Sequence, residues 1–130
     1  MILLDTHVVV WLARDYQQVS PKAQSAIEDA RKKEGGLAIS DITLVELARL
    51  ASRGRIKFVP DPESFLSEVE RRFVVLPITS NIAMQAFDLP ATYPKDPVDR
   101  VIGATALVED LPLVTADREI RQSKAVPTIW

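Results

Sequence analysis

The sequence predicts an α/β protein, a three-layer α/β/α sandwich with a central parallel sheet of four or five strands. Short apolar runs alternate with longer helical stretches over all 130 residues, which is the element order that produces a parallel sheet. No repeat or low-complexity tract interrupts this alternation. The composition, 47% hydrophobic and 26% charged, is typical of a globular chain, and the length favours a single domain over residues 1–130.

Two strands and three helices are expected in the first half of the chain. Ser20 and Pro21 mark a helix start, because serine is a favourable N-cap and proline fits the first helical position. Gly35-Gly36 ends that helix, and Ser40 or Asp41 caps the next one. The expected elements are a strand at 2–4, a helix to about residue 14, a helix at 20–33, a strand at 37–39 and a helix to about residue 51.

The second half is expected to continue the alternation. Gly54 breaks the helical pattern, and Pro60 and Pro62 punctuate the chain before the next helix. Residues 98–109 are apolar on nearly every side, so their helix is expected to be buried. The expected elements are a short strand or extended connection at 56–59, a helix at about 63–71, a strand at 73–76, a helix at 79–87, a loop at 89–97, the buried helix, a strand at 113–115, a short helix at 117–122 and a last strand at 126–130.

The composition restricts the chemistry that the chain can perform. Cysteine is absent, which excludes a disulfide scaffold, a thiolate zinc site, an iron–sulfur cluster and a cysteine nucleophile. His7 is the single histidine, so a histidine-rich metal site is excluded as well. The net charge of −2 disfavours non-specific coating of nucleic acid by bulk electrostatics and leaves local basic patches open. Any metal chemistry must therefore use oxygen ligands.

The N-terminal segment carries no recognisable export or membrane signal. It has no basic stretch before its apolar residues, and Asp5 comes too early for a signal peptide. The apolar run Val8–Ala13 is far shorter than the roughly 20 residues that span a bilayer. We expect a cytoplasmic protein without a membrane partner.

Acidic side chains stand where several predicted strands end. Asp5 directly follows the first strand, and Asp117 follows the strand at 113–115 after one residue. Asp96 and Asp99 open the buried helix, and Glu46 lies in the helix after the second strand. Right-handed crossovers bring the carboxyl ends of parallel strands to one edge, where such folds bind ligands. These acids are therefore expected to meet at that edge.

Each aspartate also has an ordinary structural explanation. Asp5 and Asp117 can be N-caps of the helices that follow them. Asp96 before Pro97 is typical of a capped helix start, and Asp99 lies in a first turn, where the helix dipole favours a carboxylate. The residues alone leave both roles open.

Glu46 is too deep in its helix to act as a cap. Glu46, Arg49 and Arg53 fall on one stripe of an otherwise apolar helix. This stripe is either an exposed ion pair on a solvated face or a metal carboxylate with two arginines placed for phosphates. Both interpretations remain open at this stage.

The acids carry more information as a group. Four or five carboxylates at one sheet edge would repel each other unless some were protonated or a cation joined them. Hard cations such as Mg²⁺ and Mn²⁺ prefer carboxylate and water oxygens, and such ions typically serve phosphate chemistry. Gly35-Gly36 lacks the lysine and the spacing of a phosphate-binding loop, and no serine–histidine couple stands out.

Four stretches stand out when they are read in order. They are Leu3-Leu4-Asp5-Thr6-His7 with Trp11-Leu12, Thr43-Leu44-Val45-Glu46-Leu47-Ala48, Asp96-Pro97-Val98-Asp99-Arg100 with Ile102 and Ala104-Thr105-Ala106, and Leu113-Val114-Thr115-Ala116-Asp117. Each is a weak motif, but together they resemble a PIN-domain ribonuclease, and more closely the VapC toxin family of type II toxin–antitoxin systems. The chain departs from the family at Gly103, where an alanine or a larger apolar residue is common; a helical glycine costs up to ~1 kcal/mol.

The resemblance implies a compact α/β/α endoribonuclease that depends on Mg²⁺ or Mn²⁺, is usually dimeric and is inhibited by a VapB-type antitoxin. It also implies roles for individual side chains. The four matching acids are Asp5, Glu46, Asp99 and Asp117. Asp96 is a neighbouring acid that binds metal through water or acts mainly as a cap, and Thr115, with Thr6 as a weaker candidate, matches a hydroxyl that supports the acids.

Three hypotheses for the function follow. The first is hydrolysis of RNA phosphodiester bonds, with Asp5, Asp99 and Asp117 as metal ligands and Glu46 as a further ligand or as the group that orients the water. Substrate phosphates would be contacted by Arg49, Arg53 or Arg100. Arg100 is also a candidate ion-pair partner of Asp96. The second is a catalytically silent PIN-like module that binds protein or RNA. The third, a phosphotransfer receiver domain, would require a lysine after a late strand, where Thr115-Ala116-Asp117 stands.

Overall fold

The computed structural model describes residues 1–33 and 35–130, whose strands form one parallel five-stranded sheet. The sheet order is β3-β2-β1-β4-β5, with β1 in the centre. The strands are β1 (Ile2–Leu4), β2 (Leu37–Ser40), β3 (Val74–Leu76), β4 (Leu113–Val114) and β5 (Thr128–Ile129).

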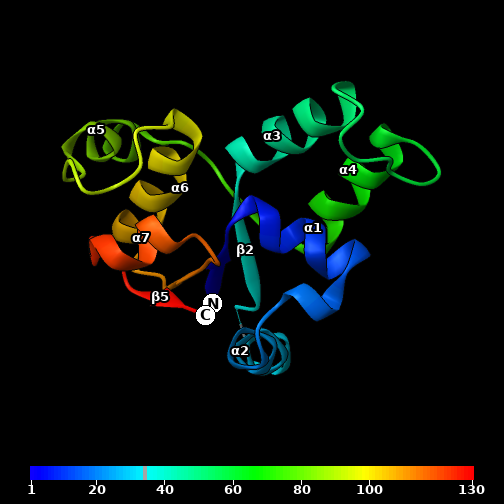
Figure 1. Ribbon diagram of the computed structural model, residues 1–130, viewed down its shortest axis with the longest axis horizontal. Coiled ribbons are helices and arrows are strands. Elements are labelled where there is room, and N and C mark those ends of the chain that lie inside the picture. The colour runs from blue at the N-terminus through cyan, green and yellow to red at the C-terminus, as the bar shows by residue number, and fades with distance from the viewer. Residues whose placement is uncertain (34) are drawn as a thin grey trace.

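Helices cover both faces of this sheet, so the predicted three-layer α/β/α class is confirmed (Figure 1). Helices α1 to α4 contribute to the core on one face, and α6 and α7 contribute to the core on the other. Helix α5 packs against α6. The helices are α1 (Thr6–Arg14), the 3₁₀ turn η1 (Tyr16–Gln18), α2 (Pro21–Lys32), α3 (Asp41–Ser52), α4 (Pro62–Arg72), α5 (Ser80–Asp88), α6 (Pro97–Val108) and α7 (Arg118–Ser123). None of these helices is long and apolar enough to cross a membrane.

Most of the helices have an N-cap residue whose side chain accepts a hydrogen bond from the first turn. Ser20 and Thr79 are N-caps, as the sequence predicts, and of the two candidates for α3 it is Ser40 that accepts a hydrogen bond, from the N–H of Ile42. Helix α4 starts at Pro62, because Asp61 caps it through a 2.8 Å hydrogen bond from the N–H of Ser64. The helix thus starts one residue before the position expected from the sequence.

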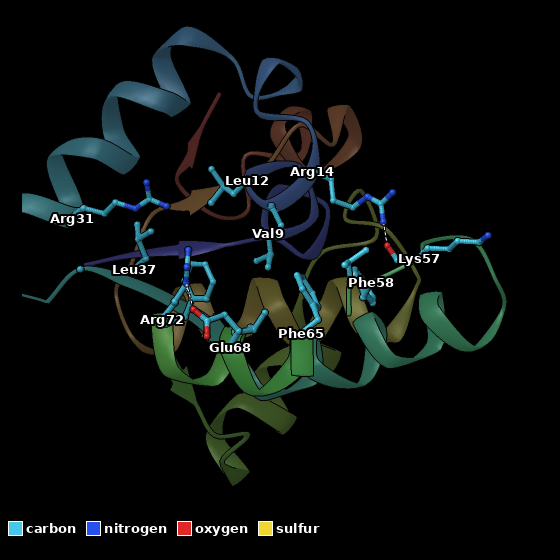
Figure 2. A pocket seen from close by; sticks show the side chains of 15 residues that line it. Val9, Leu12, Arg14, Arg31, Leu37, Lys57, Phe58, Phe65, Glu68 and Arg72 are labelled. Atoms are coloured by element: carbon cyan, nitrogen blue, oxygen red, sulfur yellow. Dashed lines mark hydrogen bonds and ion pairs between the residues drawn. The ribbon is translucent and has the colours of Figure 1, made fainter. Parts of the chain in front are cut away.

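The segment at 56–59 is an extended connection and forms no strand. Its buried Phe58 stacks on Phe65 of α4, with ring centroids 4.0 Å apart and an angle of 1° between the ring planes (Figure 2). The segment therefore packs against a helix instead of pairing with the edge of the sheet.

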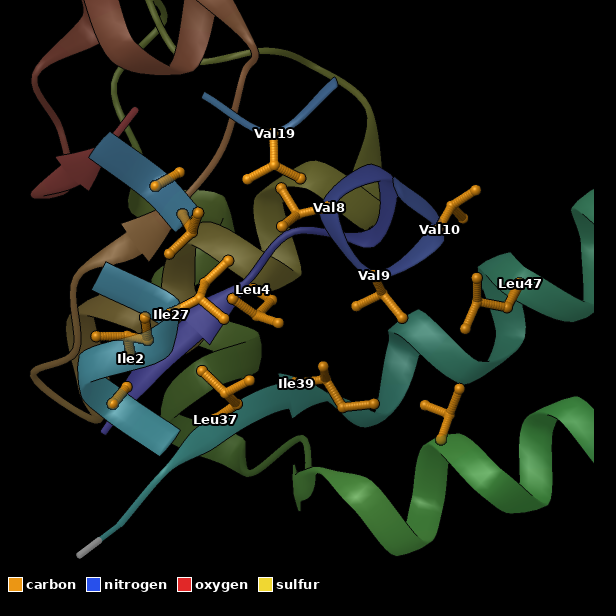
Figure 3. Close-up of a cluster of buried hydrophobic side chains, with 14 of the residues drawn as sticks. Ile2, Leu4, Val8, Val9, Val10, Val19, Ile27, Leu37, Ile39 and Leu47 are labelled. Atoms are coloured by element: carbon orange, nitrogen blue, oxygen red, sulfur yellow. The ribbon is translucent and has the colours of Figure 1, made fainter. Parts of the chain in front are cut away.

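The central strands are buried on both faces, which explains their uninterrupted apolar sequences. Ile2 and Leu4 point into the cluster beneath α1 and α2, where Figure 3 shows them beside Ile27 and Leu37. Leu3 points the opposite way, into the cluster under α6 and α7. Because its side chains enter the clusters on both faces, β1 lies in the middle of the protein. The carboxyl end of β1, at Leu4, is held there as well.

Candidate active site

The strand order reverses beside β1. From β1 the chain adds β2 and β3 on one side of the sheet and later adds β4 and β5 on the other. In open α/β sheets, the carboxyl ends of the strands at such a reversal border a binding crevice. Asp5 directly follows β1, and Thr115 directly follows β4, so both lie at that point.

Asp5 is a buried carboxyl group held from two sides. The residue is only 4% exposed. One oxygen accepts a 2.8 Å hydrogen bond from the N–H of Thr6, as part of the α1 cap, and the other accepts a 2.8 Å bond from the hydroxyl of Thr115. Within the described residues, the one basic group near it is His7, whose Nδ1 lies 3.6 Å from Asp5 Oδ2. In residues 1–33 and 35–130, no lysine or arginine forms an ion pair with this buried acid.

Thr115 links Asp5 to the last acid of the quartet. It is fully buried, and its hydroxyl accepts a 3.1 Å bond from the N–H of Asp117 while donating to Asp5. Asp117 in turn caps α7 by accepting from the N–H of Ile120 at 3.0 Å. Thr6 contacts Asp5 through its backbone N–H, which donates to the carboxyl group, whereas Thr115 uses its hydroxyl. The Thr6 hydroxyl forms a 3.1 Å hydrogen bond with that of Thr43.

Asp99 is an acid of this edge whose charged form is strongly disfavoured by its surroundings. Burial, followed by the carboxyl groups of Asp5, Asp96, Asp117 and Glu46, raises the pKa of Asp99 from 3.8 to about 7. Each of these neighbours disfavours the charged form. The acids expected to meet at the sheet edge therefore lie close enough to interact.

Glu46 lies deeper in α3 but faces the same edge. Burial raises its pKa first, the Asp96 and Asp5 carboxyl groups raise it further, and the Arg49 guanidinium opposes them. Asp96 itself caps α6, with one oxygen accepting from the N–H groups of Val98 at 2.8 Å and Asp99 at 3.3 Å. The cap occupies one Asp96 oxygen, and the charge of its side chain still reaches Glu46 and Asp99.

These groups border a cavity of about 310 Å³, called here the acid cavity. Its walls include the four acids that the sequence predicts for the site, together with apolar side chains such as Trp11 and Ile56. The full lining is Asp5, Thr6, His7, Val10, Trp11, Glu46, Leu50, Ile56, Asp99 and Asp117. Acids from four distant segments of the chain thus share one cavity.

The donor set of the acid cavity fits a hard divalent cation. All four acids offer oxygen, and Asp5 is already oriented by two hydrogen bonds. Among the described residues no group of three Asp, Glu or His side chains stands in ready coordination geometry. The acid cavity supplies the correct ligand chemistry, and a bound cation would have to draw the carboxyl groups closer.

The three arginines of the sequence analysis have different surroundings. Arg49 is exposed in the last turn of α3, the helix that carries Glu46, and Arg53 is the exposed C-cap residue of that helix. Arg100 is directed away from the acid cavity, because its guanidinium donates to the carbonyl groups of residues 86, 89, 90 and 93. No ion pair joins Arg100 to Asp96 among the described residues.

His7 contributes a contact that sequence reasoning missed. Its Nε2 accepts a 2.9 Å hydrogen bond from the N–H of Ala116, so the proton of the neutral ring lies on Nδ1, toward Asp5. The His7 ring also meets the Trp11 ring edge-on, with centroids 4.9 Å apart. The one available signal was its position two residues after Asp5, on the same helical turn.

This combination of a parallel sheet with a β1–β4 reversal and an acid-lined cavity is that of a PIN-type protein. The PIN domain family model matches residues 2–125, and the chain belongs to the PIN domain family. The resemblance drawn from the four sequence stretches is thereby confirmed.

Individual relatives place the chain near VapC proteins. It is 37% identical to Ribonuclease VapC22 of Mycobacterium tuberculosis, over 99% of this chain and 98% of that protein. Two solved structures share its fold over 98% of the chain and 97% of theirs. They are VapBC2 from Rickettsia felis bound to a promoter DNA fragment, with a TM-score of 0.73 and 19% identity, and DNA-bound VapBC from Salmonella typhimurium, with a TM-score of 0.71 and 23% identity.

The raised pKa of Asp99 predicts a pH-dependent stability. Because its folded pKa of about 7 exceeds the unfolded value near 3.8, the folded state binds more protons between these pH values, and stability falls as pH rises through this range. In EDTA, Asp99→Asn should therefore raise the melting temperature by a few degrees at pH 8 and by much less at pH 4.

Thermal unfolding followed by circular dichroism measures this difference. Asp88→Asn, an exposed position of α5 outside the acid cavity, is the matched control. A difference between Asp99→Asn and the parent chain that stays constant from pH 4 to pH 8 would contradict the electrostatic account of Asp99.

Proposed function

We propose that this chain is a Mg²⁺- or Mn²⁺-dependent endoribonuclease toxin that hydrolyses RNA phosphodiester bonds and is neutralised by a VapB-type antitoxin. The observation that carries the proposal is the acid cavity: carboxyl groups of Asp5, Glu46, Asp99 and Asp117 line one space at the strand-order reversal. The relationship to Ribonuclease VapC22 supports a nuclease of RNA over other phosphate chemistry.

The side chains of the acid cavity would divide the work. Asp5, Asp99 and Asp117 would hold the cation, with Asp96 reaching it through water. The chemistry that such a cation supplies is polarisation of a phosphoryl oxygen and activation of water for attack on phosphorus. Glu46 would ligate the same cation or orient the attacking water, and burial beside Asp96 raises its pKa above the usual carboxyl value.

The remaining walls suit a single-stranded RNA. Trp11, Leu50 and Ile56 form an apolar side of the acid cavity on which an unstacked base can pack. Arg49, in the last turn of α3, and Arg53, the C-cap of that helix, are both exposed and would contact phosphates along the entering strand. The donors of Arg100 are already used by backbone carbonyls, so we assign it no phosphate contact.

Asp5→Asn and Asp99→Asn should each reduce RNA cleavage by at least about 100-fold, because each removes a charged oxygen ligand from the acid cavity. The measurement is initial cleavage rate on a panel of single-stranded and structured RNAs with Mg²⁺, Mn²⁺ or EDTA. The parent chain should cut in Mg²⁺ or Mn²⁺ and stop in EDTA.

Asp29→Asn, on the exposed surface of α2, is the matched control and should cut at the parent rate. If the two acid-cavity variants cut as fast as the parent chain, the catalytic assignment fails. If the parent chain binds RNA but cuts none of the panel with either ion, the silent binding module becomes the better description.

A second surface supports an antitoxin partner. A groove of about 970 Å³ opens between α1, α2, α4 and the connection at 56–59, with Val9, Leu12, Leu37 and Phe65 on its walls (Figure 2). Its basic side chains are Arg14, Arg31, Lys57 and Arg72, and its acid, Glu68, is already paired with Arg72. We propose that an antitoxin segment with apolar side chains and carboxylates fills this basic-rimmed groove.

Arg31→Glu should weaken inhibition by the antitoxin about 5- to 10-fold, because it places a like charge on the groove rim. The measurement is the concentration of the purified VapB-type antitoxin that halves RNA cleavage. Lys33→Glu, an exposed lysine at the end of the same helix and outside the groove lining, should leave that concentration unchanged. Equal inhibition of the Arg31 and Lys33 variants would exclude the groove.

We also propose that the chain forms a homodimer through α5. Met84 and Phe87 lie one turn apart on this helix and are 67% and 86% exposed, which is unusual for two large apolar side chains on one face. A second copy would cover them with the same helix, since a two-fold interface is self-complementary.

Phe87→Glu should convert the dimer to single chains, because a charge would be buried at the centre of the interface. Native mass spectrometry should show twice 14.5 kDa for the parent chain and 14.5 kDa for the variant. Val59→Glu is a matched control, since Val59 is 87% exposed but lies on the connection before α4. A parent chain that is monomeric at micromolar concentration would contradict this proposal.

A further inference from the structure

Two side chains join the first turn of α6 to the loop before it. From α6, the Arg100 guanidinium donates to the carbonyl groups of Ala86 and Leu89, each at 3.1 Å, and to those of Pro90 and Tyr93 at 3.3 and 3.4 Å. In the opposite direction, the Tyr93 hydroxyl donates to the carbonyl of Asp99 at 3.0 Å. Each segment thus supplies the side chain that binds the backbone of the other.

Tyr93 packs against α6 at Gly103, where a side chain would occupy the same space as the tyrosine. Tyr93 is fully buried, and a Cβ placed on Gly103 would lie 2.3 Å from its hydroxyl oxygen and 2.6 Å from Cζ. Gly103 stands one turn after Asp99, so its missing side chain is the space through which the hydroxyl reaches the Asp99 carbonyl. The helical glycine at this position therefore has a structural reason, which is the space that Tyr93 occupies.

Asp99 needs such support because its surroundings repel it. Four other acids disfavour its charged form. Among the described residues, its backbone is fixed at both ends by side chains: its N–H donates to the Asp96 cap, and its carbonyl accepts from Tyr93.

We propose that Tyr93, which packs against Gly103, and Arg100, which holds the preceding loop, form a clamp that positions Asp99 for cation binding in the acid cavity. Tyr93 is a positioning residue in this scheme, since its hydroxyl contacts the backbone of Asp99 and lines no part of the acid cavity. The inference rests on the proposed nuclease function and adds to it the device that holds one ligand in place.

Tyr93→Phe tests the clamp, because it removes the hydroxyl and keeps the ring against Gly103. Mn²⁺ binding, followed by electron paramagnetic resonance of the free ion, should weaken by about 10-fold or more, in the range seen when a group that orients a metal ligand is lost. In RNA cleavage, kcat at fixed Mn²⁺ should fall while KM for RNA stays constant. A loss of fold alone would instead lower the melting temperature and the active fraction, without changing the Mn²⁺ affinity of the folded protein.

Two further variants complete the test. Tyr16→Phe removes the hydroxyl of an exposed tyrosine, which donates to Glu28 at 3.1 Å, and should bind Mn²⁺ as the parent chain does. Arg100→Lys keeps the charge but cannot reach four carbonyls, and it should reproduce the weaker Mn²⁺ binding even if Tyr93→Phe fails to fold.

A folded Tyr93→Phe variant with the Mn²⁺ affinity of the parent chain would overturn the clamp and leave the nuclease assignment intact. If Tyr93→Phe fails to fold, Arg100→Lys with parent affinity would have the same meaning. A parent chain that neither binds Mn²⁺ nor cuts RNA would overturn the proposed function and the clamp together.

Discussion

The crowding of carboxyl groups at the carboxyl ends of β1 and β4 is the constraint on which the rest of the structure depends. Charges of one sign in a partly buried space repel, so each acid must be held by the fold. Asp5 is held by Thr6 and by Thr115, and the same Thr115 hydroxyl accepts from the backbone of Asp117. The buried apolar strands and the helices on both faces provide the rigid frame for these contacts.

Helix capping and site formation are two uses of the same side chains. Asp5, Asp96 and Asp117 each accept from N–H groups that begin a helix, yet their charges also reach the acid cavity. The N-terminal ends of α1 and α6 carry partial positive charge, which partly offsets the repulsion among the acids. The alternatives that the sequence leaves open for these aspartates, cap or cavity acid, are therefore compatible within one structure.

The sequence predicted the features that depend on local pattern. Apolar runs placed the strands, Ser20 and Thr79 placed helix starts, and the rule for parallel strands brought the four acids to one edge. The sequence did not predict the contacts between distant segments. The pattern around Arg100 is equally consistent with an ion pair, a phosphate contact or a set of carbonyl contacts. Only the position of residues 86–93 in the structure shows that the carbonyl contacts form. Likewise, Gly103 appears as a helix defect until Tyr93 is seen to occupy the missing side-chain space.

Helix α1 separates the acid cavity from the basic-rimmed groove and touches both. Val9 and Leu12 line the groove, whereas Val10 and Trp11 line the acid cavity, because successive side chains of a helix point about 100° apart. The helix begins at Thr6, directly after its cap Asp5, and both residues line the acid cavity. A partner that fills the groove thus packs against the helix whose first residue borders the proposed reaction centre. The groove and the acid cavity therefore have α1 as a common wall, and the Asp5 cap of that helix is the residue that accepts from the Thr115 hydroxyl.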